Sequence, residues 1–319
     1  MLFFAGVLII AKEVIQMLVI LKQVVILALF SLIGCVLAKK KVINADQGGM
    51  LSALAVYVFL PCTAFNTFCT NFTVEYLTEK YPMIIVATVI MVVLIVAAKL
   101  IAKKIQPTGY DRVVYEYSMI ISNCSYMGYP LMLSLFGGEG LLDMMLFGLP
   151  HLVYTYTIGY DLLTERTGKG FSFKRLLTPV VVAMLLGCVV GLFQIPVPDV
   201  ITQVTGSAGA CLGPTGMLLL GITLSKFKPR ELLVHKKVYF ITAMRLVIIP
   251  VVIFGALKLL GLDYAIVPAI VTYAMPCGMN VVIFPQMVGR DCSRGAALML
   301  ISTVLSILTI PVCVYFMCG

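Results

Sequence analysis

Long apolar runs follow one another along the whole chain, and short connectors between them hold most of the charged residues. Runs of about 20 apolar residues have the length of a helix that crosses a bilayer. The pattern predicts ten membrane-spanning helices, at residues 17–38, 49–68, 82–98, 115–136, 142–163, 178–194, 199–223, 238–260, 264–288 and 296–317. Residues 1–13 are also apolar, and they either extend the first span or lie along the membrane surface.

The composition strengthens this prediction. Of 319 residues, 61% are hydrophobic and 12% are charged, which is about half the charged fraction of a typical soluble domain. In lipid only helices and closed barrels satisfy every backbone polar group, and the alternating segments of a barrel are not visible. We therefore expect an all-α polytopic membrane protein. Met1–Gly6 precede the first apolar run without a basic residue, so no cleaved signal peptide is expected.

The basic residues indicate how the spans are oriented. Connectors after the odd-numbered spans hold 18 of the 23 Lys and Arg residues, in the segments 39–41, 99–112, 166–175, 226–237 and 290–294. Connectors after the even-numbered spans hold Lys80 and little else, with Lys258 near one of them. The positive-inside rule then places both termini outside the cytoplasm, in a multi-pass protein of the plasma membrane. The net charge of +9 is a topology signal on this view, and the lipid bilayer, not a nucleic acid, is the expected partner.

Similar features recur in the two halves at an offset of about 152 residues. Leu60-Pro61-Cys62 falls near Gly213-Pro214-Thr215, and Cys124–Gly128 falls on Pro276–Asn280. Each half holds five spans, so the second half enters the membrane from the opposite side. The sequence thus predicts two inverted five-helix repeats, residues 1–165 and 175–319, an arrangement typical of transporters.

Helix-breaking residues occur near the middle of four predicted spans, at Pro61, Gly128–Pro130, Pro214, and Pro276 with Gly278. Backbone that unwinds at membrane depth is tolerated only inside protein or beside a wet cavity. Spans four and nine also hold polar side chains beside their breaks, namely Ser122, Asn123, Ser125, Thr272 and Asn280. One isolated proline more often only kinks a helix, but two breaks with Asn in equivalent spans indicate a binding site.

A broken helix can bind charge at both of its new ends. The N-terminal end of one half attracts a carboxylate, and the carbonyl end of the other half attracts a cation. The amides of Asn123 and Asn280 can either donate to an anion or accept from a protonated group.

Three segments resemble the auxin efflux carrier family, which includes bacterial permeases for malonate and malate. They are Leu60-Pro61 followed by Phe65-Asn66, the segment Asn123–Pro130, and Met275-Pro276 through Asn280-Val-Val-Ile-Phe284. The resemblance covers residues 17–317, and the span-nine segment is its best motif. The connector after span five is short, so the large regulatory loop of the plant carriers is missing.

The resemblance implies a fold similar to those of bile-acid symporters and sodium/proton antiporters. Spans four and nine would cross at their broken centres and bind a substrate carboxylate there. A scaffold would consist of spans 17–38, 49–68, 178–194 and 199–223, and the other six spans would form a moving transport domain. The candidate substrate-binding residues are Asn123, Ser125, Gly128, Pro130, Thr272, Pro276, Gly278 and Asn280 at the crossing, with Pro61 and Asn66 facing it from the scaffold.

Two further residues have possible roles in charge or proton movement. Arg245 lies about seven residues inside span eight, where it could guide an anion or snorkel to the membrane surface. His151, near the middle of span five, could carry a proton or serve only in packing. Gly187 and Gly191 allow close helix packing, either within the subunit or in a homodimer through the scaffold helices.

We therefore expect a secondary transporter of a small organic anion that works by alternating access. No cofactor is expected, and the coupling ion could be H⁺ or Na⁺. A cation/proton antiporter would require carboxylates at the crossing, and spans four and nine have none there. An intramembrane enzyme would need an aspartate pair, a Ser/His pair or an HExxH metal site, and none of these motifs occurs; no metal site is expected. The inverted repeat also disfavours a passive channel.

The orientation can be tested by labelling single cysteines introduced into residues 137–141 and 226–237 with an impermeant maleimide. We expect the first group to react from outside intact cells and the second only after permeabilisation, because the basic connectors stay in the cytoplasm. The reverse pattern would show that the charge-based orientation is wrong.

Overall fold

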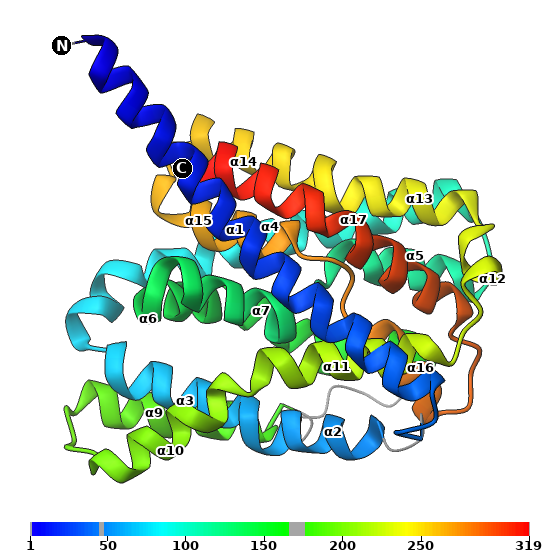
Figure 1. Cartoon of the computed structure of the whole chain (residues 1–319), viewed down its shortest axis with the longest axis horizontal. Helices are drawn as coiled ribbons and strands as arrows, with labels where there is room; N and C mark the ends of the chain where they lie inside the picture. The colour runs from blue at the N-terminus through cyan, green and yellow to red at the C-terminus, as the bar shows by residue number, and fades with distance from the viewer. Residues whose placement is uncertain (1, 45–47, 166–175, 319) are drawn as a thin grey trace.

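The structure, a computed structural model, describes residues 2–44, 48–165 and 176–318, and the regular secondary structure of these residues is helical, apart from one isolated β-bridge (Figure 1). The first half contains α1 (Leu2–Lys39), α2 (Gly48–Leu54), η2 (Ala55–Phe59), α3 (Leu60–Asn71), α4 (Val74–Ile105), α5 (Tyr110–Ile120), η3 (Cys124–Gly128), α6 (Tyr129–Phe147), α7 (Leu149–Tyr154), η4 (Thr155–Gly159) and α8 (Tyr160–Thr164). The second half contains α9 (Pro179–Leu192), α10 (Asp199–Ala210), α11 (Leu212–Ser225), α12 (Pro229–Leu233), α13 (Lys236–Ala243), η6 (Met244–Ile248), α14 (Ile249–Leu259), η7 (Asp263–Ala265), α15 (Ile266–Ala274), α16 (Asn280–Met287) and α17 (Ser293–Cys318).

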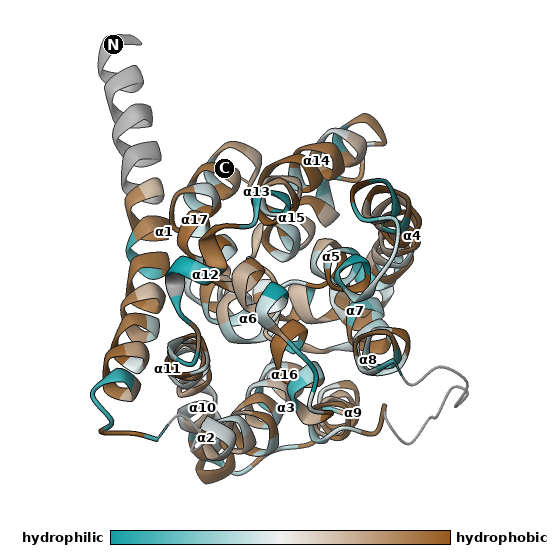
Figure 2. Ribbon diagram, turned by 90° about the vertical axis from the view of Figure 1, so that its right-hand side faces the viewer, coloured by the Kyte–Doolittle hydropathy of each residue, from teal (hydrophilic) through white to brown (hydrophobic). Residues whose placement is uncertain are grey.

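Seven of the described helices are long and apolar enough to cross a membrane, and α9 and Asp263–Ala274 are shorter apolar helices. The chain is thus a multi-pass helical membrane protein, as predicted. Its outward-facing side chains are largely apolar: Ile85, Val89 and Val96 of α4 are each more than half exposed. In Figure 2 α4 and α14 lie on the outside of the bundle, and α14 is mostly apolar in colour. Such a surface is stable in lipid, where apolar side chains need no burial.

Local sequence explains where several helices begin and turn. The Thr73 hydroxyl caps α4 by accepting a hydrogen bond from the backbone N–H of Tyr76 at 3.1 Å. Thr178 caps α9 in the same way, and Pro179 occupies the first turn, where its missing N–H costs nothing. Gly137 has a φ of 70°, which bends α6 and gives that glycine a conformation that other residues rarely adopt.

Connectors from different parts of the sequence meet at the two ends of the bundle. At one end, where α12 and α13 lie on the right in Figure 1, Lys237 donates to the Gln106 side chain at 2.6 Å, and Arg294 pairs with Asp111 at 2.9 Å. At the opposite end Asp143 accepts from Tyr76 and lies 3.7 Å from Lys80. The connectors at 99–112, 226–237 and 290–294, which are predicted to face one side of the membrane, therefore lie together. The basic residues predicted at 166–175 fall outside the described residues.

Two of the helix breaks predicted from the sequence are wrong in position. The break expected at Gly128–Pro130 lies instead at residues 121–123, and Gly128 and Pro130 are helical. Pro61 likewise causes no interruption, because it lies in the first turn of α3, which continues directly from η2. The first helix α1 begins at Leu2, and its stretch that is long and apolar enough to cross a membrane is Met17–Lys39.

The small residues of α9 are used inside the subunit. A Cβ atom on Gly187 would lie 2.8 Å from the Phe68 Cβ, and one on Gly191 would lie 2.5 Å from the Phe72 carbonyl oxygen. Both glycines therefore let α9 approach α3 closely, which is the packing that a small-xxx-small pattern permits. This is the intrasubunit alternative considered for these residues.

Gly191→Ala should therefore destabilise the protein, and Gly206→Ala should not. The added Cβ at Gly191 would contact the backbone of α3, and such overpacking costs about 1–3 kcal/mol of unfolding free energy. Gly206 on α10 has no atom within 4 Å of the added Cβ, and the helix gains about 0.5–1 kcal/mol from alanine. Thermal melting with a thiol-reactive dye, which reports exposure of Cys277, Cys292 and Cys313, measures both. Equal melting temperatures for the two variants would contradict the packing assignment.

Candidate functional site

Two interrupted helices cross near the centre of the molecule. In the first, α5 ends, three residues are not helical, and the helix resumes as η3 and α6. In the second, α15 ends and the helix resumes as α16 after a gap. Their gaps pair as a short antiparallel bridge between Ser122 and Cys277. The Asn123 N–H donates to the Pro276 carbonyl at 2.8 Å, and the Gly278 N–H donates to the Ile121 carbonyl at 3.3 Å. Each gap thus satisfies backbone groups that the other leaves unpaired.

Side chains from neighbouring helices complete this pairing. The Ser302 hydroxyl of α17 accepts a hydrogen bond from the Cys277 N–H at 3.0 Å. Gly278 lies at the point of closest approach, where a Cβ atom would lie 3.2 Å from the Ser122 carbonyl oxygen, a distance tighter than most Cβ contacts. These contacts meet the demand that backbone unwound at membrane depth be satisfied by protein.

Arg245 joins the carbonyl ends of the two half-helices that enter the crossing. Its Nη1 donates to the carbonyls of Met119 and Ile120 at 2.8 and 3.2 Å. Its Nη2 and Nε donate to the carbonyls of Thr272 and Met275 at 3.3 and 3.2 Å. The residue is 1% exposed, and its guanidinium carbon lies 5.6 Å from the centre of the Tyr273 ring. Arg245 therefore does not snorkel to the membrane surface but lies at the centre of the fold.

The electrostatics of this arrangement are favourable. The C-terminal end of a helix has a partial negative charge, and α5 and α15 both end at the guanidinium. Two such ends and four carbonyl oxygens offset the free-energy cost of burying the guanidinium charge.

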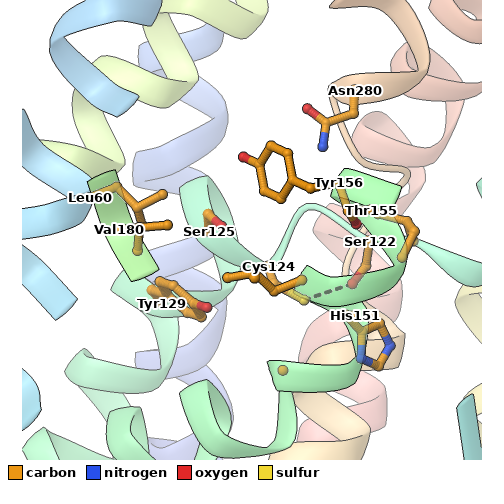
Figure 3. A pocket seen from close by; sticks show the side chains of 13 residues that line it. Leu60, Ser122, Cys124, Ser125, Tyr129, His151, Thr155, Tyr156, Val180 and Asn280 are labelled. Atoms are coloured by element: carbon orange, nitrogen blue, oxygen red, sulfur yellow. Dashed lines mark hydrogen bonds between the residues drawn. The ribbon is translucent and has the colours of Figure 1, made fainter. Parts of the chain in front are cut away.

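A cavity of about 90 Å³ lies beside the crossing (Figure 3). This is room for several water molecules or one small solute. Its lining consists of Leu60, Ile121, Ser122, Cys124, Ser125, Tyr129, Gly148, His151, Leu152, Thr155, Tyr156, Val180 and Asn280. In Figure 3 the apolar side chains of Leu60 and Val180 lie on one side and Ser122, Thr155 and Asn280 on the other.

The polar groups that line this cavity are neutral hydrogen-bonding groups. They include five hydroxyls, the Asn280 amide, the Cys124 thiol and the His151 ring, and the lining set contains no Asp or Glu. Cys124 and Asn280 are also the first residues after the two gaps, so the N-terminal ends of η3 and α16 lie at the cavity. Hydroxyl and amide donors together with helix N-termini can bind an anion.

Three predicted site residues line the cavity: Ser125, His151 and Asn280. Pro276, Gly278, Thr272 and Asn123 take part in the crossing itself, but they do not line the cavity. Asn123 is 3% exposed, and its side-chain nitrogen Nδ2 makes no hydrogen bond to the described residues. His151 is buried against Tyr273, with ring centroids 5.2 Å apart.

The remaining predicted residues lie outside the cavity. Pro130 packs against α11, because a Cβ on Gly213 would lie 2.8 Å from its ring. Gly128 lies in η3, and Pro61 follows the lining residue Leu60. Asn66 accepts a hydrogen bond from Thr205 of α10 at 3.3 Å. Asn66 therefore contacts α10 and does not line the cavity.

The lining residues that sequence reasoning missed as site residues include Cys124, Tyr129, Thr155 and Tyr156. One signal for the last two was the polar cluster after His151, which is unusual in an apolar span.

A second signal is visible only in three dimensions. Each of the four π-helical turns in the described chain lies next to the cavity or holds Arg245: η2 precedes Leu60, η3 begins at Cys124, η4 begins at Thr155, and η6 contains Arg245. Such turns re-aim side chains and occur often at functional sites.

Comparison with known proteins identifies a family. The family described as membrane transport protein matches residues 19–314, so the chain belongs to this family of auxin-efflux-carrier-like proteins. An uncharacterized transporter from Methanothermobacter thermautotrophicus is 25% identical over 201 residues. The match covers 59% of this chain and 63% of the relative, so the chain spans less than two thirds of that protein's length.

Ser302→Ala should destabilise the crossing, and Ser306→Ala on the same helix is the matched control. Ser302 is the acceptor for the buried Cys277 N–H, and leaving such a donor unpaired costs about 1–3 kcal/mol. Ser306 is equally buried but donates only to the Thr303 carbonyl within its own helix. Thermal melting should show a clear loss for Ser302→Ala and a small change for Ser306→Ala. The opposite ranking would mean that Ser302 does not support the crossing.

Proposed function

Because the chain belongs to a family of membrane transporters, we propose that it is a secondary transporter that moves a small organic anion by alternating access. The cavity beside the crossing is the substrate site in this proposal, and the substrate is a carboxylate. The observation that carries the proposal is the lining of that cavity, which combines hydroxyl and amide donors with two helix N-termini and contains no acidic side chain.

The size of the cavity favours a small substrate. A volume of about 90 Å³ is far below the 300–1,000 Å³ that pockets for drug-sized ligands occupy. The same lining disfavours the antiporter alternative, because a site that binds and releases cations against protons needs a carboxylate at the crossing. The substrate carboxylate would accept from Ser122, Ser125 and Asn280, and its remaining atoms would contact Leu60 and Val180.

The position of the cavity supports an elevator-like movement. Leu60 on α3 and Val180 on α9 belong to the predicted scaffold, whereas the other lining residues belong to the predicted transport domain. Glycines of α11 form a further contact between the two parts, because a Cβ on Gly213 or Gly216 would meet Pro130 or Tyr126. A substrate bound here would move with the transport domain past Leu60 and Val180.

The crossing also supports the proposed inverted repeat of ten spans. The two gaps exchange reciprocal backbone hydrogen bonds on either side of the Ser122–Cys277 bridge. Equivalent segments of two inverted repeats would produce such a symmetric contact. In this proposal the basic end of the bundle faces the cytoplasm.

Ligand binding can be tested on the purified protein. Melting temperatures are measured with acetate, malonate, malate and other small carboxylates, each against a chloride salt of the same cation and ionic strength. A ligand that binds only the folded protein at 100 times its Kd adds about 2.7 kcal/mol of stability. Failure of every carboxylate to raise the melting temperature or to enter proteoliposomes would contradict the proposed substrate class.

Asn280 provides the sharpest test of the site. Asn280→Ala removes a donor at the cavity and should weaken carboxylate binding about tenfold, which corresponds to about 1.4 kcal/mol. Asn280→Asp should weaken it further, because it places a negative charge beside the substrate. Asn71→Ala, on α3, is the matched control, because this amide donates to Thr67 and Thr70 of its own helix. Unchanged transport in both Asn280 variants would exclude this cavity as the substrate site.

A further inference from the structure

The carbonyl ends of the two half-helices form what would ordinarily be a cation site. Met119, Ile120, Thr272 and Met275 direct four carbonyl oxygens from two chain segments toward one point. Unwound carbonyls and half-helix C-termini of this kind coordinate coupling cations in other secondary transporters.

In this protein the point is already occupied by a side chain. Arg245 reaches it from η6 on a third helix and uses all three guanidinium nitrogens to bind the four oxygens. The charge is isolated from acids, since no Asp or Glu among the residues described forms an ion pair with Arg245. A sodium ion would have to displace this group before it could contact the same carbonyls.

The charge of Arg245 also reaches the proposed anion site. Ile120, whose carbonyl it binds, precedes the lining residues Ile121 and Ser122. The Thr272 carbonyl that accepts from Arg245 also accepts from the Cys124 thiol at 4.0 Å, and Cys124 lines the cavity. An arginine cannot lose its proton in a protein, so the positive charge is permanent.

We propose that Arg245 is the built-in counter-charge of the anion site and takes the place of a co-transported cation, so that anion transport by this protein needs no sodium ion. This inference rests on the proposed function for its anion and adds the identity of the group that balances its charge. Arg245 is a positioning residue in this role, because it acts on the substrate through the crossing and its field.

The cation part of the proposal is tested without any substrate. The wild type and Arg245→Ser are melted in sodium, potassium and choline chloride at equal concentration. The wild type should melt at the same temperature, within about 1 °C, in all three salts. Arg245→Ser opens the carbonyl site, so sodium or millimolar guanidinium chloride should raise its melting temperature relative to choline. Lys258→Ala removes a positive charge from the same predicted span at an exposed position and should show no such response. A sodium-specific shift in the wild type would overturn the proposal.

Uptake into proteoliposomes tests the link to the anion. Malonate uptake by the wild type should have the same rate in sodium and in choline, and Arg245→Ser should lose at least tenfold in apparent affinity in choline. Guanidinium or sodium should restore part of that loss in Arg245→Ser. A merely structural defect, of the kind that Arg245→Lys could repair, would not be restored by these cations. If Arg245→Ser does not fold, Arg245→Lys and the wild-type salt comparison still decide. A tenfold dependence of wild-type uptake on sodium overturns the inference alone, whereas absence of carboxylate binding under every salt overturns the proposed function.

Discussion

The need to satisfy backbone groups at membrane depth governs the centre of this protein. Two helices stop and restart there, and each stop leaves carbonyls on one side and N–H groups on the other. The two gaps answer part of this need by pairing with each other through Asn123, Pro276, Ile121 and Gly278. Ser302 and Arg245 supply the rest from neighbouring helices. The crossing therefore depends on tertiary contacts, because neither interrupted helix could satisfy the backbone groups of its gap alone.

This arrangement separates charge across the crossing. The carbonyl ends of α5 and α15 are closed by a guanidinium, while the N-terminal ends of η3 and α16 lie at a cavity with hydroxyl and amide groups. The field of Arg245 and the two helix N-termini have the same sign at that cavity. A neutral crossing with open carbonyls would favour a cation instead. The placement of one side chain thus favours an anion as the ligand.

Sequence alone predicted the helical membrane fold, because hydrophobic run length and basic connectors are local properties. It also placed the second gap correctly at Pro276 and Gly278, because these helix-breaking residues themselves lie in the gap. It misplaced the first gap at Gly128–Pro130, because a proline in the first turn of a helix is compatible with that helix. The gap at residues 121–123 holds neither Pro nor Gly, and the contact with the other gap holds it open. The role of Arg245 could not be predicted either, because its four acceptors lie 27–126 residues away in sequence.

A fixed counter-charge changes the energetics of transport compared with a bound cation. A co-transported ion leaves with the substrate, whereas Arg245 stays in the protein when the site is empty. Within the proposal, a bound monocarboxylate makes the crossing electrically neutral, which lowers the cost of moving it through a low-dielectric region. The empty crossing keeps one positive charge, and each such charge experiences about 2.3 kcal/mol per 100 mV across the membrane. The membrane potential would then act mainly on the return of the empty site, and a negative interior would draw that site toward the cytoplasm.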